Sequence, residues 1–401
     1  MKALAFAARS LFRQPGRAGL GILGIAAVGA LLFDMLLLSR GLVVSFRDLL
    51  DEVGFDVRVL ASDAVVIGGP RVTRAAQVAR EVAALPEVAE AIPLRMAEAE
   101  ADGPGQRSIT LSVTGVDLGR RRPWALVAGD DLESEQGGEL PALLVTASLA
   151  TALGTRPGST VMLRFLCGPD RTALPMTTFR VAGLADFPFD SAEQLSAAAT
   201  RSSVARACGD QSDDWADMLL VASSEGHGAD AAVAAIRRQR PELYPATNEQ
   251  IVARMRDTGF TYFRQISAVL STITMVFGFL LITVLLTVSV NQRLGEIAAL
   301  RALGFSRARV AADVLSQSVL LVGSGGALAL PLGVALSVWL DAILKAMPGI
   351  PASMHFFVFE GRALALHGAL LAVTALLAAL YPMWLVATLP IATTLRNEVV
   401  S

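Results

Sequence analysis

Four long apolar runs divide the chain into hydrophobic and polar stretches. Charge is almost absent from them: the first contains only Asp34, the third only Asp313, and the second and fourth none, although the fourth carries His367. About 20 apolar residues cross about 30 Å of hydrocarbon at 1.5 Å per residue of helix. The pattern therefore predicts four membrane-spanning helices. The runs are Ala18–Leu38, Ile266–Val290, Val310–Leu340 and Ala363–Val386.

These runs give a complete domain plan for an α-helical membrane protein with a large α+β domain between its first two spans. We expect spans at 18–39, 264–290, 310–342 and 363–387, an outer domain at 40–263 and an outer loop at 343–362. The remaining segments, 1–17, 291–309 and 388–401, are then cytoplasmic.

Basic flanks orient the predicted spans. The first seventeen residues carry Lys2, Arg9, Arg13 and Arg17 and no acid. The segment between the second and third runs is also basic, and positive flanks stay on the cytoplasmic side. We therefore expect both termini in the cytoplasm and the large domain in the periplasm, in a cytoplasmic (inner) membrane. The first span is too long for a cleaved signal peptide, so we expect it to remain as an anchor.

The polar middle reads as alternating short strands and helices. The amphipathic segment Val72–Leu85, stopped by Pro86, predicts a helix, and so does Asp230–Arg240, with a helical turn at Ser148–Leu153. Strands are predicted at Asp56–Leu60, Ile109–Val116, Ala142–Val145, Thr160–Leu166, Thr178–Leu184 and Met218–Ala222.

Helical periodicity also continues from the membrane into this domain. Ser39–Glu52 extends the first span, and Thr247–Gln250 resembles a capping box that starts a helix able to run from Ile251 into the second span. Gly259 weakens the second helix by about 1 kcal/mol. The two segments form either long stalks that carry movement to the outer domain or short juxtamembrane helices.

Small residues interrupt the third run, and two interpretations stay open. They permit close helix packing within the subunit, or they form a flexible face for a second subunit. These residues are Gly323, Gly325, Gly326, Pro331 and Gly333.

Composition narrows the chemistry. Hydrophobic residues make up 53% and charged residues 17%, and the net charge of −2 argues against nucleic acid as a partner. Neither of the two lysines, Lys2 and Lys345, follows the glycine-rich loop of a P-loop nucleotide site, and the three histidines lack metal-ligand spacing. We expect no enzyme activity, no metal and no cofactor in this chain.

Three further residues are candidates for special roles. Cys167 and Cys208 are permitted, but not required, to form a disulfide in an oxidising compartment. A carboxylate such as that of Asp34 raises the free energy of membrane insertion by about 2.5–3.5 kcal/mol when it lies near the centre of a span. Asp34 is either a polar intramembrane site or a tolerated acid that bonds to a group such as Thr283 or Ser289.

The segment between the second and third runs carries the most information. Its apolar residues fit a short amphipathic helix, and Gly304 is suitably placed just beyond the helix end. The apolar face of such a helix either fits a groove on a soluble partner or lies on the bilayer surface.

This segment resembles the coupling motif of the MacB/FtsX/LolC-type ABC transporter permeases. Residues 293–306 read RLGEIAALRALGFS, against the family pattern R-x-x-E-I-A-x-L-R-A-L-G-x-S. The resemblance implies that an ATPase contacts Arg293, Glu296, Ile297, Leu300, Arg301, Leu303 and Gly304. The tail is similar to the family ending at Tyr381, Pro382, Pro390, Arg396 and Glu398.

The resemblance also implies how the chain works. Two permease subunits, identical or different, would sit on a dimer of separate ATPase subunits that bind ATP and Mg. ATP-driven closure would move the periplasmic domains, a mode of action called mechanotransmission (type VII). The expected function is export or extraction of a hydrophobic or amphipathic substrate, by efflux or lipoprotein release, with a periplasmic adaptor or a lipoprotein as a further partner. The alternative is an FtsX-like transducer that transports nothing and regulates a periplasmic or cell-wall protein.

Overall fold

The computed structural model describes residues 15–388, with gaps at 64–68, 106, 134–139, 168–173, 211–213, 255–260, 293–294, 296, 299–302, 305, 348–349, 352 and 359–360. The chain forms two compact units. We call them the membrane unit, formed by Met1–Leu42, Phe260–Ala342 and His355–Ser401, and the head domain, formed by Val43–Gly259 and Ile343–Met354.

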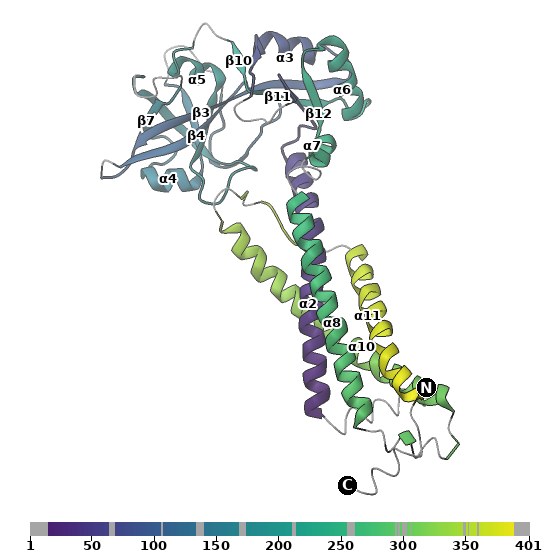
Figure 1. Ribbon diagram of the computed structural model, residues 1–401. Helices are drawn as coiled ribbons and strands as arrows, with labels where there is room; N and C mark the ends of the chain where they lie inside the picture. Colours follow the sequence, from purple (N-terminus) through teal and green to yellow (C-terminus); the bar gives the residue numbers. More distant parts are fainter. Residues whose placement is uncertain are drawn as a thin grey trace. The chain divides into compact units, whose positions relative to one another are not determined.

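Four helices are long and apolar enough to cross a membrane (Figure 1). They are α2 (Pro15–Glu52), α8 (Thr261–Asn291), α10 (Arg307–Lys345) and α11 (Gly361–Thr388). Together with the α+β domain between α2 and α8, they confirm the predicted fold class.

Close contacts between small residues hold the membrane unit together. A Cβ added at Gly29 would lie 2.8 Å from Ala329 Cβ, and one at Gly325 would lie 2.6 Å from Ile25 Cγ2. These spacings bring α2 and α10 close enough for dispersion to act along their length. A cluster of buried aliphatic side chains fills the centre of the bundle: Ile25, Ile282, Leu286, Leu321, Val322, Ala375, Ala378 and Ala379.

Most of the glycines of the third span therefore serve packing within the subunit. Gly325 lies against Ile25, a Cβ at Gly333 would lie 3.0 Å from Phe33, and one at Gly326 would lie 3.0 Å from Leu371. A Cβ at Gly323 would meet no atom within 4 Å.

The head domain is built on one ten-stranded sheet. Its strand order is β12-β1-β11-β3-β4-β9-β6-β8-β5, and β7 pairs with both β3 and β8. The strands are β1 (Val57–Leu60), β3 (Val88–Asp102), β4 (Ser108–Val116), β5 (Ala125–Gly129), β6 (Ala142–Val145), β7 (Thr160–Phe165), β8 (Thr177–Asp186), β9 (Ser196–Thr200), β11 (Met218–Ser223) and β12 (Tyr244–Thr247). A separate two-stranded ladder joins β2 (Val72–Thr73) to β10 (Trp215–Ala216).

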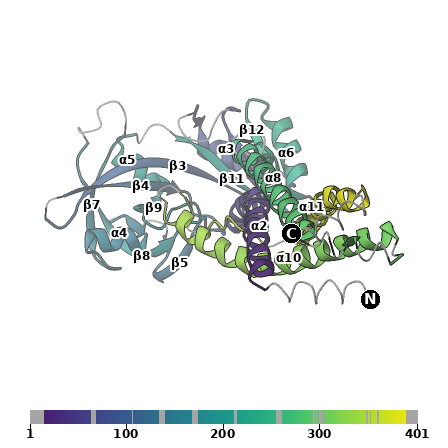
Figure 2. The same cartoon turned by 60° about the horizontal axis from the view of Figure 1, so that its bottom comes forward.

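The long strand β3 connects two ends of the head. Figures 1 and 2 show α3 and α6 near one end of β3 and α4 and α5 near the other. Each end has its own apolar core, and a third core lies along the sheet between them. The helices are α3 (Ala75–Ala83), α4 (Ala147–Leu153), α5 (Arg201–Ala207), α6 (Gly228–Gln239) and α7 (Asn248–Arg254).

Two expectations for this domain need correction. The helix predicted for Val72–Leu85 is confirmed as α3 over Ala75–Ala83, but its predicted start is wrong. Val72–Thr73 pairs as a strand, and Arg74 takes a left-handed conformation, with φ 53°, before α3 begins. The longest strand, β3, was missed because alanine and glutamate dominate Val88–Asp102 and hide the alternation of strand residues.

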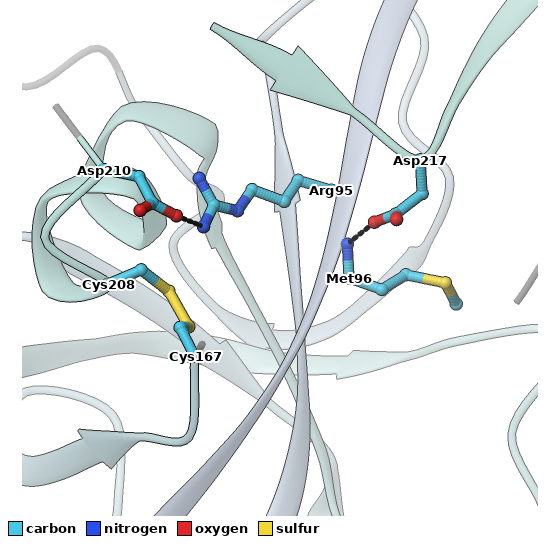
Figure 3. The surroundings of a disulfide bond; sticks show 6 residues. All are labelled: Arg95, Met96, Cys167, Cys208, Asp210 and Asp217. Atoms are coloured by element: carbon cyan, nitrogen blue, oxygen red, sulfur yellow. Dashed lines mark hydrogen bonds and ion pairs between the residues drawn. A yellow bond between two sulfur atoms is a disulfide. The ribbon is translucent and has the colours of Figure 1, made fainter. Parts of the chain in front are cut away.

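A buried arginine in the middle of β3 lies near a disulfide (Figure 3). Cys167, after β7, is bonded to Cys208, at the end of α5. Two residues further on, Asp210 accepts a 2.5 Å hydrogen bond from Arg95 of β3, whose side chain is 1% exposed. The Arg95 guanidinium also lies 3.9 Å from the ring centre of Trp215. Burial lowers the pKa of Arg95, and the bond to Asp210 opposes that shift.

Replacing Asp210 by Asn should therefore destabilise the head. The change leaves the Arg95 charge buried without its counterion, and because Asp210 itself is one-third exposed we expect a loss of roughly 2 kcal/mol. Thermal unfolding of the full chain in detergent measures the effect. Asp186→Asn, at an exposed strand end, is the control, and equal melting temperatures for the two variants would contradict this assignment.

Candidate coupling site

The segment between α8 and α10 has one face packed against the membrane helices. Ile297 and Ala298 are helical and buried, at 8% and 1% exposure. Ile297 lies in an apolar cluster with Val290, at the end of α8, and Val310, at the start of α10. Ile297 therefore anchors the segment, and in this conformation its side chain is not available to a partner.

The same cluster explains why the loop and tail motifs occur together. Met383, within the tail sequence Tyr381–Trp384, packs against the cluster around Ile297. Tyr381 is half-exposed and its ring lies 6.5 Å from that of Trp384, while Pro382 is buried inside α11. The end of α11 thus supports the loop, and the two motifs form one structural site.

Leu303, further along the segment, is the described large apolar residue with the most exposed side chain there. Its exposed fraction is 79%. Gly304 follows it with φ 95°, in the left-handed region that favours glycine. Leu303 and Gly304 thus form a turn before α10 begins at Arg307.

The remaining motif residues cannot be placed. Arg293, Glu296, Leu300 and Arg301 of the loop lie outside the described residues. The same holds for the tail residues Pro390, Arg396 and Glu398.

A second group of interacting residues lies where two helices enter the head. The helix α2 is continuous from Pro15 to Glu52, and its last turns belong to the head. The helix α7 starts at Asn248, and the Thr247 hydroxyl accepts a 3.1 Å hydrogen bond from Gln250 N, which confirms the predicted cap. Whether α7 continues into α8 is a question that falls on 255–260, outside the described residues.

Asn248 connects these helix ends. Its side-chain nitrogen donates to Asp51 Oδ1 at 2.8 Å, in α2, and to the Phe55 carbonyl oxygen at 3.1 Å. Its side-chain oxygen accepts a hydrogen bond from Arg58 of β1. We call Asp51, Phe55, Arg58 and Asn248 the stalk junction. Asn248 is 4% exposed, so these bonds form away from water, where an unmade bond is costly.

Arg58 is the residue of the junction that the sequence pattern did not reveal. It lies between Val57 and Val59 in a strand flanked on both sides by other strands, and it is 6% exposed. Burial lowers the pKa of Arg58 to about 10, and the nearby Asp51 carboxylate offsets part of the shift. A charged residue within a short valine-rich run was the available signal.

Weaker contacts and a cleft surround the junction. Arg47 of α2 forms a 2.7 Å ion pair with Glu249 of α7, and both side chains are exposed. A polar cleft of ≈ 370 Å³ lies beside them, lined by Arg47, Asp51, Asp56, Ala229, Thr247, Asn248 and Glu249. The buried bonds of Asn248 therefore determine the geometry, because exposed ion pairs contribute little.

Sequence comparison identifies the membrane region. Residues 268–391, which hold the coupling segment and α10 and α11, match the family model of the FtsX-like permease C-terminal domain. This part of the chain is therefore similar to the C-terminal domain of FtsX-like permeases. The matched residues include the loop motif and the tail motif as far as Pro390.

Three solved structures are similar to about half of this chain. The periplasmic region of MacB from Actinobacillus actinomycetemcomitans aligns with 53% of this chain and 99% of its own, at 12% identity and a TM-score of 0.38. The extracellular domain of the noncanonic ABC-type transporter YknZ from Gram-positive bacteria aligns with 48% of this chain and 99% of its own, at 10% identity and a TM-score of 0.34. A domain of a permease protein from Porphyromonas gingivalis aligns with 48% of this chain and 87% of its own, at 16% identity and a TM-score of 0.28. The comparison with curated proteins gave no match.

Asp34 has a different partner from the one expected. Its side chain is fully buried, and Asp34 Oδ1 accepts a 2.7 Å hydrogen bond from the Ser337 hydroxyl of α10. The expectation of Thr283 or Ser289 is wrong, because Thr283 donates to the Phe279 carbonyl oxygen in its own helix and Ser289 donates to Gln317. The Asp34 bond therefore connects α2 to α10.

Replacing Asn248 by Leu should loosen the stalk junction. The change removes the side-chain oxygen that accepts from the buried Arg58 and the side-chain nitrogen that donates to Asp51. We expect it to lower the free energy of unfolding of the head by about 2–3 kcal/mol. Hydrogen exchange should increase at the end of α2 and the start of α7. Glu249→Gln removes only the exposed pair with Arg47 and should leave exchange nearly unchanged, so equal effects of the two variants would contradict the role given to Asn248.

Proposed function

We propose that this chain is the permease subunit of an ABC transporter that performs mechanical work outside the membrane, driven by a separate ATPase. The observation that carries the proposal is the arrangement of the coupling segment. The segment is anchored by Ile297 in the membrane unit, and further along it presents Leu303 to solvent. An anchored segment that exposes the apolar side chain of Leu303 suits a helix-in-groove contact with a soluble partner.

The path away from this segment supports the proposal. The 38 residues of α2 extend about 57 Å at 1.5 Å per residue, whereas the hydrocarbon layer is about 30 Å thick. The surplus enters the head, where Asn248 ties it to α7 and β1. Movement of α2 is thus transferred to the sheet through buried hydrogen bonds.

The packing of the bundle supports action by the head. Its centre is filled by aliphatic side chains such as Ile282 and Leu286, and glycines hold α2 against α10. We therefore propose that the cargo is a hydrophobic or amphipathic molecule taken at the outer membrane surface, for efflux or for lipoprotein release. A periplasmic adaptor or lipoprotein is the further partner in this scheme.

The proposed assembly contains two permease subunits and an ATPase dimer that binds ATP and Mg. It lies in the cytoplasmic membrane, with the coupling segment and both termini in the cytoplasm and the head outside. The exposed arginine at position 309 and the other basic residues of this segment support that orientation.

Leu303→Asp should uncouple the ATPase. A carboxylate in an apolar groove remains partly desolvated, so we expect binding of the ATPase to weaken by about 2–3 kcal/mol, which is a loss of roughly 30- to 150-fold. Co-purification and the ATP hydrolysis rate of the complex measure this. Leu303→Met keeps the apolar contact and should behave as the wild type. If Leu303→Asp binds and turns over normally, the segment does not contact the ATPase.

Cysteine accessibility tests the orientation. Ser306→Cys, beside the coupling segment, should be protected from a membrane-impermeant maleimide in intact cells, and Ala234→Cys, exposed on α6, should be labelled. The natural cysteines are paired in the disulfide, so background labelling should be low. After lysis both positions should react. The reverse pattern in intact cells would place the head inside.

A further inference from the structure

The segment between α10 and α11 is grouped with the head and not with the helices it connects. Ile343–Met354 belongs to the head domain, although Ala342 before it and His355 after it belong to the membrane unit. The chain therefore passes between the two units four times: once in α2, once before α8, and at both ends of this segment. We call Ile343–Met354 the strap.

Specific contacts hold the strap on one loop of the head. Pro351 forms an isolated antiparallel bridge with Ser191. The Ser353 hydroxyl donates a 2.9 Å hydrogen bond to the Pro188 carbonyl oxygen. Met354 at the end of the strap is 6% exposed. The partners lie in the segment 187–195 that joins β8 to β9.

The chain just beyond the strap is fixed within the membrane unit. Phe356 N donates a 2.8 Å hydrogen bond to Asp341 Oδ1, near the end of α10. A Cβ added at Gly41 of α2 would lie only 2.1 Å from the Phe356 carbonyl oxygen, so the α2 backbone contacts this segment directly. Phe356 and Phe357 are themselves buried. The residues that follow the strap are therefore fixed against α2 and α10.

The loop that receives the strap also contacts the stalk junction. Arg58, which bonds to Asn248, lies 5.7 Å from the ring centre of Phe189. Phe189 stands between Pro188 and Ser191, the two residues that meet the strap. A contiguous set of contacts thus connects both attachments of the head.

We propose that the strap is a second mechanical attachment of the head, which stays docked on 187–195 and moves that loop with α10 and α11. The stalk junction acts on β1 and β12, and the strap acts on the loop that joins β8 to β9. The head is then held at two points of the chain instead of one, so both α2 and the end of α10 displace it. The docking stands independently, and the role in force transfer rests on the proposed function.

Cross-linking tests the docking in the full chain without any ATPase. Residues paired across an antiparallel bridge have Cα atoms about 4.5–5.5 Å apart, within the range for a disulfide. Ser191→Cys with Pro351→Cys should form an intramolecular bond in membranes under mild oxidation, detected by mass spectrometry of the digested protein. Each single variant is the control. Failure of the pair to cross-link while both cysteines react with maleimide would overturn the docking.

Slackening the strap tests its role. Inserting Gly-Ser-Gly-Ser between Met347 and Pro348 should raise hydrogen exchange in 187–195 by about tenfold, because the loop loses a fixed partner. The same insertion between Pro104 and Gly105, in the exposed turn after β3, should leave that exchange unchanged.

The complex with the ATPase then separates docking from transmission. Adding ATP should change exchange in 187–195 in the wild type and not in the strap-insertion variant, while ATP hydrolysis continues in both. If the cross-link forms but ATP alters this loop equally in both proteins, the strap is docked and carries no force. If ATP is hydrolysed and the loop responds in neither protein, the proposed transmission itself fails and the docking result still stands.

Discussion

The architecture depends on the continuity of α2. One hydrogen-bonded helix runs from Pro15 to Glu52, through the membrane unit and into the head, with no proline after its first residue. A helix is stiff along its axis because each turn is bonded to the next, so displacement at one end reaches the other. Small residues make this possible inside the bundle, since Gly29 and Gly325 allow α10 to pack directly along α2.

The two ends of this path use different physics. At the coupling segment the anchoring is apolar: Ile297 is held among Val290, Val310 and Met383, while Leu303 stays exposed. At the stalk junction the anchoring is polar, through the hydrogen bonds of Asn248 to Asp51 and Arg58. Buried polar bonds are directional and costly to break, so they fix orientation where a purely apolar contact would permit sliding.

The sequence predicted the membrane architecture well because hydrocarbon imposes a strict rule. Charge-free runs of sufficient length have few alternatives to a spanning helix. The family resemblance of the segment between α8 and α10 was also visible in its residues. The head was harder to predict. The strand β3 is rich in alanine and glutamate, and Arg58 looks like a surface residue until β11 and β12 are known to flank it. Likewise, the Ser337 partner of Asp34 lies 303 residues away, a contact that only the packing of α2 on α10 defines.

The central claim is that nucleotide bound by a partner moves the head of a chain that has no P-loop lysine. A single probe on the head measures this directly. A spin label at Ala234→Cys, in the permease reconstituted with its ATPase in lipid nanodiscs, reports the distance between the heads of two subunits by double electron–electron resonance. The account predicts that this distance distribution shifts when ATP is added under non-hydrolysing conditions, and that the shift is absent with Leu303→Asp. An unchanged distribution in a complex that binds ATP would contradict it.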